Sequence, residues 1–324
     1  MRKNVLVLID WLNENKIYRE MLEKNENYSF NYKLGKDLNE EDFENVQIII
    51  GNCKHDLLNK FNKLEWVQLQ SAGTDGYTTA GVLPENTKLT NATGTYGLTI
   101  SEYLIGSTLM MQRRFLQYVD NQRKSLWQPE GNIQSIYGST FLIIGLGDIG
   151  TEFAKRVKAM GGYTIGVKRT IYGDEEYVDE CYTTEELKNL LHRADVIVSS
   201  VPNTPQTKHM YNKEIFTKMK SNAVFINVGR GNAVVLDDLC DALDKELIFG
   251  AVIDVTDPEP LPNTHRAWQT SNLFITPHVS GNYSLEETKR RFIRLASQNL
   301  ENYKNKENLI SEVNFSTGYR MKKI

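Results

Sequence analysis

The sequence predicts a two-domain α/β protein whose larger domain is a doubly wound parallel sheet. The main observation is the segment Phe141–Gly150, an apolar strand that runs directly into the spacing G-x-G-x-x-G. A helical stretch at Thr151–Met160 and a second apolar strand at Tyr163–Val167 follow. This is the order that the dinucleotide-binding Rossmann motif requires.

Each glycine of this motif has a physical task. Gly145 makes the tight turn, Gly147 lets the backbone approach a pyrophosphate, and Gly150 lets the helix pack closely on the strand. The first turn of the helix, with Asp148 and Ile149, offers free N–H groups and the positive end of its dipole to phosphates. The alternative is a glycine-rich turn in another α/β protein, but the complete strand, turn, helix and strand favour dinucleotide binding.

The first part of the chain is predicted to form a smaller parallel α/β unit. Its strands are expected at Asn4–Ile9, Val46–Ile50, Leu64–Gln70 and Lys88–Asn91. The stretch Thr99–Val119 is then expected to form one long helix. Its apolar residues cover more than one stripe, so it should pack against more than one partner.

Six strands are expected in the larger domain, at residues 141–145, 163–167, 195–199, 223–228, 248–253 and 273–276. The amphipathic stretch Leu285–Asn302 does not fit a seventh unit and is expected to return to the first domain. We therefore assign residues 1–98 and 286–324 to a flavodoxin-like substrate domain and residues 99–285 to the dinucleotide-binding domain.

The composition is that of a soluble enzyme. The 324 residues, 40% hydrophobic and 24% charged, suffice for two cores. A net charge of −3 gives no reason to expect a nucleic-acid partner. No apolar stretch reaches the length of a membrane span or of a signal segment. The three cysteines have no C-x-x-C spacing, which argues against a metal site and a disulfide framework, so we expect a reduced, cytoplasmic setting.

Further segments, spread over nearly the whole chain, carry a second signal. Three of them lie at the ends of predicted strands: Asn227–Gly231 (NVGRG), Asp254–Pro262 (DVTDPEPLP) and Thr276–Gly281 (TPHVSG). The others are Ser71–Asp75, Ser101–Glu102, Gly145–Gly150 and Val201–Thr207. Together, and in this order, they resemble the D-isomer-specific 2-hydroxyacid dehydrogenase family.

The resemblance implies that Arg230, Glu259 and His278 are the catalytic residues. The chemistry needs these types. A guanidinium holds the carboxylate of a 2-oxo acid with a planar fork of charge-assisted hydrogen bonds, and it polarises the neighbouring carbonyl. Hydride arrival leaves negative charge on the carbonyl oxygen, which calls for a proton donor, and an imidazole exchanges its proton near neutral pH. A carboxylate beside the imidazole favours the imidazolium form and orients the ring.

Each of these assignments has a structural alternative. Arg230 could cap a strand or pair with a structural carboxylate, and Glu259, between two prolines, could face solvent. Of the five histidines, only His278 directly follows an apolar strand and a proline. That is the edge at which an open parallel sheet binds ligands, which favours His278.

The substrate and cofactor contacts follow from the same resemblance. The backbone N–H groups of Ala72, Gly73 and Thr74 are expected to bind the substrate carboxylate together with Arg230 and His278, with an ordinary turn as the alternative.

Four more residues complete the expected cofactor site. Asp254 is implied to bind the nicotinamide carboxamide, unless it is a strand-end aspartate that faces water. Pro202, Thr207 and Val228 are expected along the cofactor.

The end of the second Rossmann strand departs from the pattern of NAD-binding proteins, which place an acidic residue there for the ribose 2′-OH. This chain has Lys168, Arg169 and Thr170, and its first acids are in Asp174–Glu176. These groups suit a 2′-phosphate, so we predict NADPH over NADH. Surface charges, or an acidic loop that folds back to the ribose, are the alternatives.

The sequence thus predicts an enzyme that reduces a small 2-oxo acid to the D-2-hydroxy acid, with the substrate in a cleft between the domains. The wide apolar coverage of Thr99–Val119 and the resemblance imply a two-fold homodimer. The alternative is that this helix is buried within one chain. D-3-phosphoglycerate dehydrogenase and a nucleotide-sensing, corepressor-like binding protein on the same fold are the alternative functions.

Overall fold

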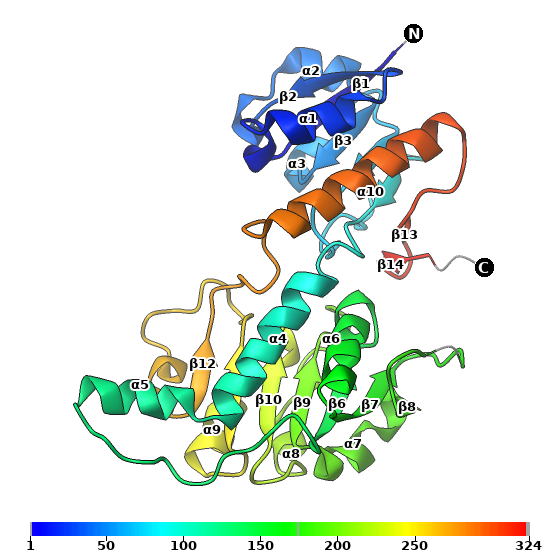
Figure 1. Cartoon of the computed structure of the whole chain (residues 1–324). Helices are drawn as coiled ribbons and strands as arrows, with labels where there is room; N and C mark the ends of the chain where they lie inside the picture. Colours follow the sequence, from blue (N-terminus) through cyan, green and yellow to red (C-terminus); the bar gives the residue numbers. More distant parts are fainter. Residues whose placement is uncertain (1, 174, 322–324) are drawn as a thin grey trace. The chain divides into compact units, whose positions relative to one another are not determined.

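The computed structural model describes residues 2–173 and 175–321, and it divides into two compact units (Figure 1). Unit 1 contains the residues up to Tyr96 and those from Tyr283 onward, and unit 2 is Gly97–Asn282. The chain therefore enters unit 2 once and leaves it once. Each unit has its own sheet and its own apolar core.

Unit 1 has a five-stranded parallel sheet of order β2-β1-β3-β4-β5. The strands are β1 (Lys3–Leu8), β2 (Tyr28–Tyr32), β3 (Ile48–Gly51), β4 (Trp66–Gln68) and β5 (Lys88–Thr90). This order is that of flavodoxin-like sheets, which confirms the predicted class of the smaller unit. Strand β2 was not predicted. It is an edge strand with one buried, two partly buried and two exposed residues, so it lacks the continuous apolar run of the central strands.

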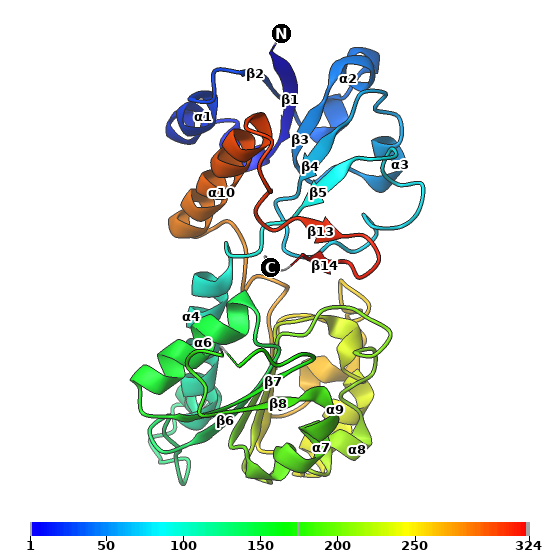
Figure 2. The same cartoon turned by 90° about the vertical axis from the view of Figure 1, so that its right-hand side faces the viewer.

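The helices of unit 1 cover both faces of this sheet (Figure 2). They are α1 (Lys16–Glu23), α2 (Glu40–Asn45), α3 (His55–Leu58) and α10 (Glu286–Lys304). Helix α10 packs against α1, and the Tyr28 hydroxyl donates a hydrogen bond to the Leu300 carbonyl at 2.7 Å. The Asn299 amide also donates to the Gln68 side chain at 2.8 Å. The late helix thus completes the core of the early unit, followed by a small hairpin of β13 (Val313–Asn314) and β14 (Tyr319–Arg320).

Unit 2 has a seven-stranded sheet of order β12-β11-β10-β9-β6-β7-β8, parallel throughout. Its strands are β6 (Thr140–Ile144), β7 (Tyr163–Lys168), β8 (Glu180–Thr183), β9 (Val196–Ser199), β10 (Val224–Asn227), β11 (Gly250–Ile253) and β12 (Leu273–Ile275). The strand order reverses between β6 and β9, which is the doubly wound arrangement predicted. Strand β8 was missed because all four of its residues are only partly buried and it has no apolar run.

Helices lie on both faces of the unit 2 sheet, with α4 and α6 on one side and α7, α8 and α9 on the other (Figure 2). Their bounds are α4 (Gly97–Gln112), α5 (Phe115–Arg123), α6 (Asp148–Ala159), α7 (Leu187–Leu190), α8 (Lys213–Phe216) and α9 (Leu236–Asp244). Single 3-10 turns occur in the two units at Asp10–Leu12, Gly35–Asp37, Thr184–Glu186, Leu191–Arg193, Gly231–Ala233 and Arg266–Gln269. Among residues 2–173 and 175–321, no helix combines the length and the apolarity that crossing a bilayer requires.

The expectation of one helix over Thr99–Val119 is wrong. The chain breaks between α4 and α5, where Arg114 adopts a left-handed conformation with φ of 57°. Its guanidinium donates to the Asn132 carbonyl at 2.7 Å and lies 4.7 Å from the centre of the Phe249 ring. These tertiary contacts stabilise the left-handed conformation of Arg114. The local sequence contains no glycine or proline, so it does not predict a break here.

Candidate active site

The predicted residues of unit 2 lie at one edge of its sheet, because the carboxyl ends of parallel strands share an edge. They are Gly145–Gly150 after β6, Lys168–Thr170 at the end of β7, Pro202 and Thr207 after β9, Val228 and Arg230 after β10, Asp254 and Glu259 after β11, and His278 after β12. This is the edge at which doubly wound sheets bind their ligands.

His278 and Glu259 are in direct contact. His278 Nδ1 lies 2.9 Å from Glu259 Oε2, and Glu259 Oε1 accepts a hydrogen bond from the Thr256 N–H at 3.0 Å. The carboxylate is therefore fixed on one side by backbone and holds the imidazole on the other. His278 Nε2 is then the ring nitrogen that can meet a ligand. More than half of the His278 side chain is exposed, so it is open to a reacting molecule.

Asp254 shapes the turn that carries His278. Its side chain is buried, with 1% of the residue exposed. Oδ1 accepts hydrogen bonds from the Thr276 hydroxyl at 2.6 Å and from the Val279 N–H at 2.9 Å, while Oδ2 accepts from the Ser280 N–H at 3.0 Å. Asp254 thus holds the segment on both sides of His278, whose φ is 53°. The alternative that Asp254 is a strand-end aspartate facing water is wrong.

Tyr103 on α4 extends this network and was not singled out from the sequence. Its hydroxyl lies 2.6 Å from the Thr276 hydroxyl, which itself donates to Asp254. Since the Thr276 proton goes to Asp254, the Tyr103 hydroxyl is the donor in its contact with Thr276. Burial raises the pKa of Tyr103, which keeps the phenol protonated and able to donate.

The turn that carries Arg230 needs the glycine on either side of it. A Cβ on Gly229 would lie 2.4 Å from the Val201 carbonyl oxygen, and one on Gly231 would lie 1.9 Å from the Thr256 carbonyl oxygen. Asn227, at the end of β10, accepts from the Gly229 N–H at 3.1 Å and donates to the Arg230 carbonyl at 3.0 Å. The half-buried Arg230 is therefore presented by a tightly packed turn, and its Nη1 donates to the Gly229 carbonyl at 2.9 Å.

The glycine motif is built as its spacing predicts. Gly145 has φ of 100° and donates to the Val167 carbonyl at 2.8 Å. A Cβ on Gly150 would lie 2.0 Å from the Gly145 carbonyl oxygen, so the helix could not approach the strand, whereas a Cβ on Gly147 would meet open space. Asp148 and the half-buried Ile149 form the first turn of α6, and Asp148 Oδ2 accepts from the Gly97 N–H at 2.8 Å.

The loop after β9 is braced by its own threonines. The Thr207 hydroxyl donates to the Pro202 carbonyl at 2.6 Å and accepts from the Thr204 N–H at 2.9 Å. Thr207 therefore fixes the loop, while Val228 after β10 is buried. The contacts of these residues with a cofactor remain predictions.

Lys168 is engaged in an ion pair that the sequence did not reveal. Its Nζ lies 2.9 Å from Oε1 of Glu175, whereas Arg169 and Thr170 are exposed beside it. Part of the acidic loop therefore does fold back, but to Lys168. Asp174 lies outside the described residues.

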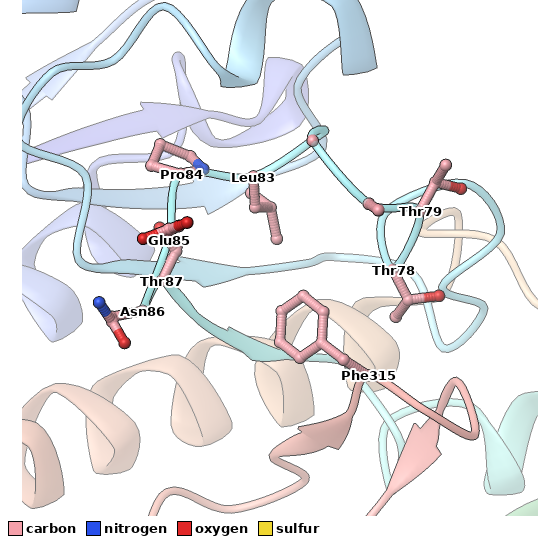
Figure 3. A pocket seen from close by; sticks show the side chains of 10 residues that line it. Thr78, Thr79, Leu83, Pro84, Glu85, Asn86, Thr87 and Phe315 are labelled. Carbon is pink, nitrogen blue, oxygen red and sulfur yellow. The ribbon is translucent and has the colours of Figure 1, made fainter.

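In unit 1, Ala72, Gly73 and Thr74 form a turn beyond β4. The Asn91 amide donates to the Ala72 carbonyl and the Thr74 hydroxyl donates to the Gly318 carbonyl, both at 2.8 Å. None of the three backbone N–H groups donates to another described residue. The turn thus has the donors that the sequence predicts for a carboxylate, and its role stays a prediction. A cavity of about 300 Å³ in this unit, between the Thr78–Thr87 loop and Phe315, contains none of the predicted residues (Figure 3).

Comparison with known proteins decides the family. Residues 105–280 match the model of the D-isomer specific 2-hydroxyacid dehydrogenase, NAD binding domain. The chain belongs to this family. It is therefore an NAD(P)-dependent oxidoreductase, as the resemblance predicted.

Three similar proteins place the chain within the family. A D-isomer specific 2-hydroxyacid dehydrogenase family protein from Aeromonas salmonicida is 31% identical, with a TM-score of 0.85 over 97% of this chain and 100% of that one. The human glyoxylate reductase/hydroxypyruvate reductase is 35% identical over 62% of this chain and 62% of its own length. An NADPH-dependent glyoxylate/hydroxypyruvate reductase from Sinorhizobium meliloti, solved with NADP and sulfate, is 25% identical, with a TM-score of 0.82 over 98% and 100% of the two chains.

Proposed function

We propose that this dehydrogenase reduces a small 2-oxo acid to the D-2-hydroxy acid with NADPH. The observation that carries the proposal is the His278–Glu259 pair, held at the same sheet edge as the glycine motif by the buried Asp254. A proton donor beside a dinucleotide site is the arrangement that reduction of a carbonyl requires.

The glycine motif fits a dinucleotide, since Gly147 leaves room for a close approach and α6 directs its N-terminal N–H groups there. The bound nicotinamide supplies the hydride. Arg230 would hold the substrate carboxylate and polarise the adjacent carbonyl. His278 would give the proton on Nε2 to the developing alkoxide, and Glu259 would stabilise the imidazolium before that transfer.

Glyoxylate and hydroxypyruvate are the proposed substrates. Both appear in the names of the human and Sinorhizobium meliloti relatives. Both are small 2-oxo acids whose carboxylate lies beside the reacting carbonyl, which is the pair of groups that Arg230 and His278 would serve. D-3-phosphoglycerate oxidation is the alternative reaction, and it would need an additional site for the substrate phosphate.

NADPH is the proposed cofactor because cationic and hydroxyl groups occupy the end of β7. Arg169 and Thr170 are exposed there. A 2′-phosphate carries about two negative charges, which an arginine and a hydroxyl can bind. A carboxylate at the strand end would instead favour the ribose 2′-OH of NADH.

A panel of 2-oxo acids with NADPH or NADH, followed by cofactor absorbance, tests this function. We expect turnover of glyoxylate or hydroxypyruvate, with a higher kcat/KM for NADPH. The matched control is His278→Ala, which should bind NADPH but reduce both acids far more slowly than the wild type. Tight nucleotide binding without turnover of any acid would contradict the enzyme assignment and favour a nucleotide sensor.

We also propose a two-fold homodimer through α5 and the loop that follows it. Phe115 and Val119 on α5 are exposed by 53% and 46%. Leu126 and Trp127 in the loop are exposed by 47% and 103% and line a cavity of about 750 Å³. Large apolar side chains exposed along one short stretch of chain indicate an interaction surface, and a symmetric pair of identical chains is the commonest way to cover one.

Light scattering tests this assembly. We expect twice the 37.1 kDa mass of one chain. Trp127→Lys should give the monomer mass. Trp268→Lys, at a half-exposed tryptophan elsewhere in unit 2, is the control that should not.

A further inference from the structure

The Glu175 carboxylate connects the loop after β7 to the end of that strand. Glu175 Oε1 lies 2.9 Å from Lys168 Nζ, and the same carboxylate accepts hydrogen bonds from the N–H groups of Tyr172 at 2.8 Å and Gly173 at 2.9 Å. Lys168 Nζ also lies 5.2 Å from the centre of the Tyr172 ring. Lysine, tyrosine, glycine and glutamate thus form one connected cluster at the strand end that the sequence assigns to the ribose.

The ion pair is shielded from solvent. The Glu175 side chain is 7% exposed and that of Lys168 is 19% exposed. The Lys168 ammonium and the two backbone N–H groups lower the pKa of Glu175 to about 2, so its charge persists at any working pH. The pair therefore presents no net charge to a ligand, although the sequence alone shows two adjacent cations.

We propose that Glu175 sets the cofactor selectivity of this dehydrogenase by neutralising Lys168, so that Arg169 and Thr170 alone recognise the 2′-phosphate. Glu175 is a positioning residue, which acts on the nucleotide through Lys168 and through the charge of the loop. This inference rests on the proposed use of NADPH. It adds that the ion pair with Glu175 holds the preference below the level that an unpaired Lys168 would give.

The two partners of the pair should then act in opposite directions. Glu175→Gln keeps one of the two side-chain oxygens, so it can still accept from one of the Tyr172 and Gly173 N–H groups. It removes the negative charge and releases the Lys168 charge toward the phosphate. Lys168→Gln leaves the Glu175 carboxylate uncompensated beside the phosphate. If the ion pair had only a structural role, its loss would loosen the loop in both variants. The ratio of the two dissociation constants would then shift in the same direction in both.

Dissociation constants for NADPH and NADH, measured by quenching of protein fluorescence, provide the test. The quantity compared is the ratio of the NADH constant to the NADPH constant. We expect Glu175→Gln to raise this ratio by about 3- to 10-fold and Lys168→Gln to lower it by a similar factor. The double variant should return close to the wild-type ratio. All shifts should shrink at about 0.5 M salt, because the charges are screened.

Glu176→Gln is the matched control, since it removes the same charge from the neighbouring, exposed residue of the loop. We expect it to change the ratio much less than Glu175→Gln. Shifts of the two ion-pair variants in the same direction, or no shift in either, would overturn the role of Glu175 and leave a wild-type preference for NADPH standing. Conversely, a wild-type ratio at or below one would contradict the proposed cofactor, while opposite shifts would still support Glu175 as the selectivity residue.

Discussion

His278 Nδ1 faces Glu259 Oε2 at 2.9 Å, and this contact determines which ring nitrogen can serve a substrate. Because Nδ1 is engaged, the proposed proton transfer to the substrate would start from Nε2. Glu259 is itself held by the Thr256 N–H at 3.0 Å, so the ring orientation is tied to the backbone. The predictions below begin with this pair.

Replacing His278 by alanine should lower kcat for reduction by roughly 10²–10⁴-fold, the usual contribution of a positioned general acid. The dissociation constant of NADPH should change little, because the proposed role of the side chain is to act on the substrate carbonyl. His192→Ala, at an exposed histidine of the same unit, is the control. Near-normal turnover of the His278 variant at neutral pH would show that another group supplies the proton.

Glu259→Gln should lower kcat for reduction and change the dissociation constant of NADPH little, because a neutral amide replaces the carboxylate that lies 2.9 Å from His278 Nδ1. Steady-state kinetics and nucleotide binding measure the two quantities. A variant that keeps the wild-type kcat would contradict the proposed role of Glu259 beside His278.

Arg230→Ala should raise KM for the oxo acid and lower kcat, since in the proposed function the guanidinium would both bind the carboxylate and polarise the carbonyl. Arg230→Lys should restore only a small part of the activity, because an ammonium cannot form the planar two-point contact. Recovery of full kcat/KM with lysine would leave no role for the planar fork.

Asp254→Ala should reduce the free energy of unfolding by roughly 2–4 kcal/mol, because it leaves the Val279 N–H and the buried Ser280 N–H without their acceptor. It should also lower kcat, since the His278 turn loses its support. Urea denaturation and steady-state kinetics measure the two effects. An alanine variant as stable as the wild type would contradict the proposed role of the network.

Glu180 on β8 provides a pH-dependent prediction. It accepts hydrogen bonds from both Arg193 Nη atoms and from the Tyr163 hydroxyl, and these contacts lower its pKa to about 2. A carboxylate with a depressed pKa stabilises the fold above its unfolded value of about 4.3, and the contribution disappears as pH falls toward 2. Glu180→Gln should therefore unfold at a lower temperature than the wild type at pH 7, by a margin that shrinks between about pH 4 and 2. A margin independent of pH would point to packing rather than charge.

The central strands of both sheets could be predicted from the sequence, whereas the edge strands β2 and β8 could not. Strands such as β1 and β3 are buried on both faces, so they appear in the sequence as continuous apolar runs. The edge strands β2 and β8 are half exposed, and their formation depends on pairing with a neighbour. The break at Arg114 likewise depends on residues distant in the sequence, Asn132 and Phe249.

The candidate site shows the same division. The glycine spacing and the strand-end positions of Arg230, Glu259 and His278 can be predicted, because each follows from where a parallel strand ends. The Lys168–Glu175 pair and the Tyr103–Thr276–Asp254 network could not, since they depend on how loops and helices fold back onto the strand ends.

The two crossings of the chain, at Tyr96–Gly97 and Asn282–Tyr283, have a consequence for how the protein emerges from the ribosome. Unit 2 is one uninterrupted segment and can close its sheet as soon as β12 has been synthesised. Unit 1 is synthesised first, but its core is complete only after α10 has been synthesised, because Tyr28 forms a hydrogen bond with Leu300 and Gln68 with Asn299. The nascent chain therefore completes its second unit before its first, and loss of the late helix would damage the half of the protein that was translated earliest.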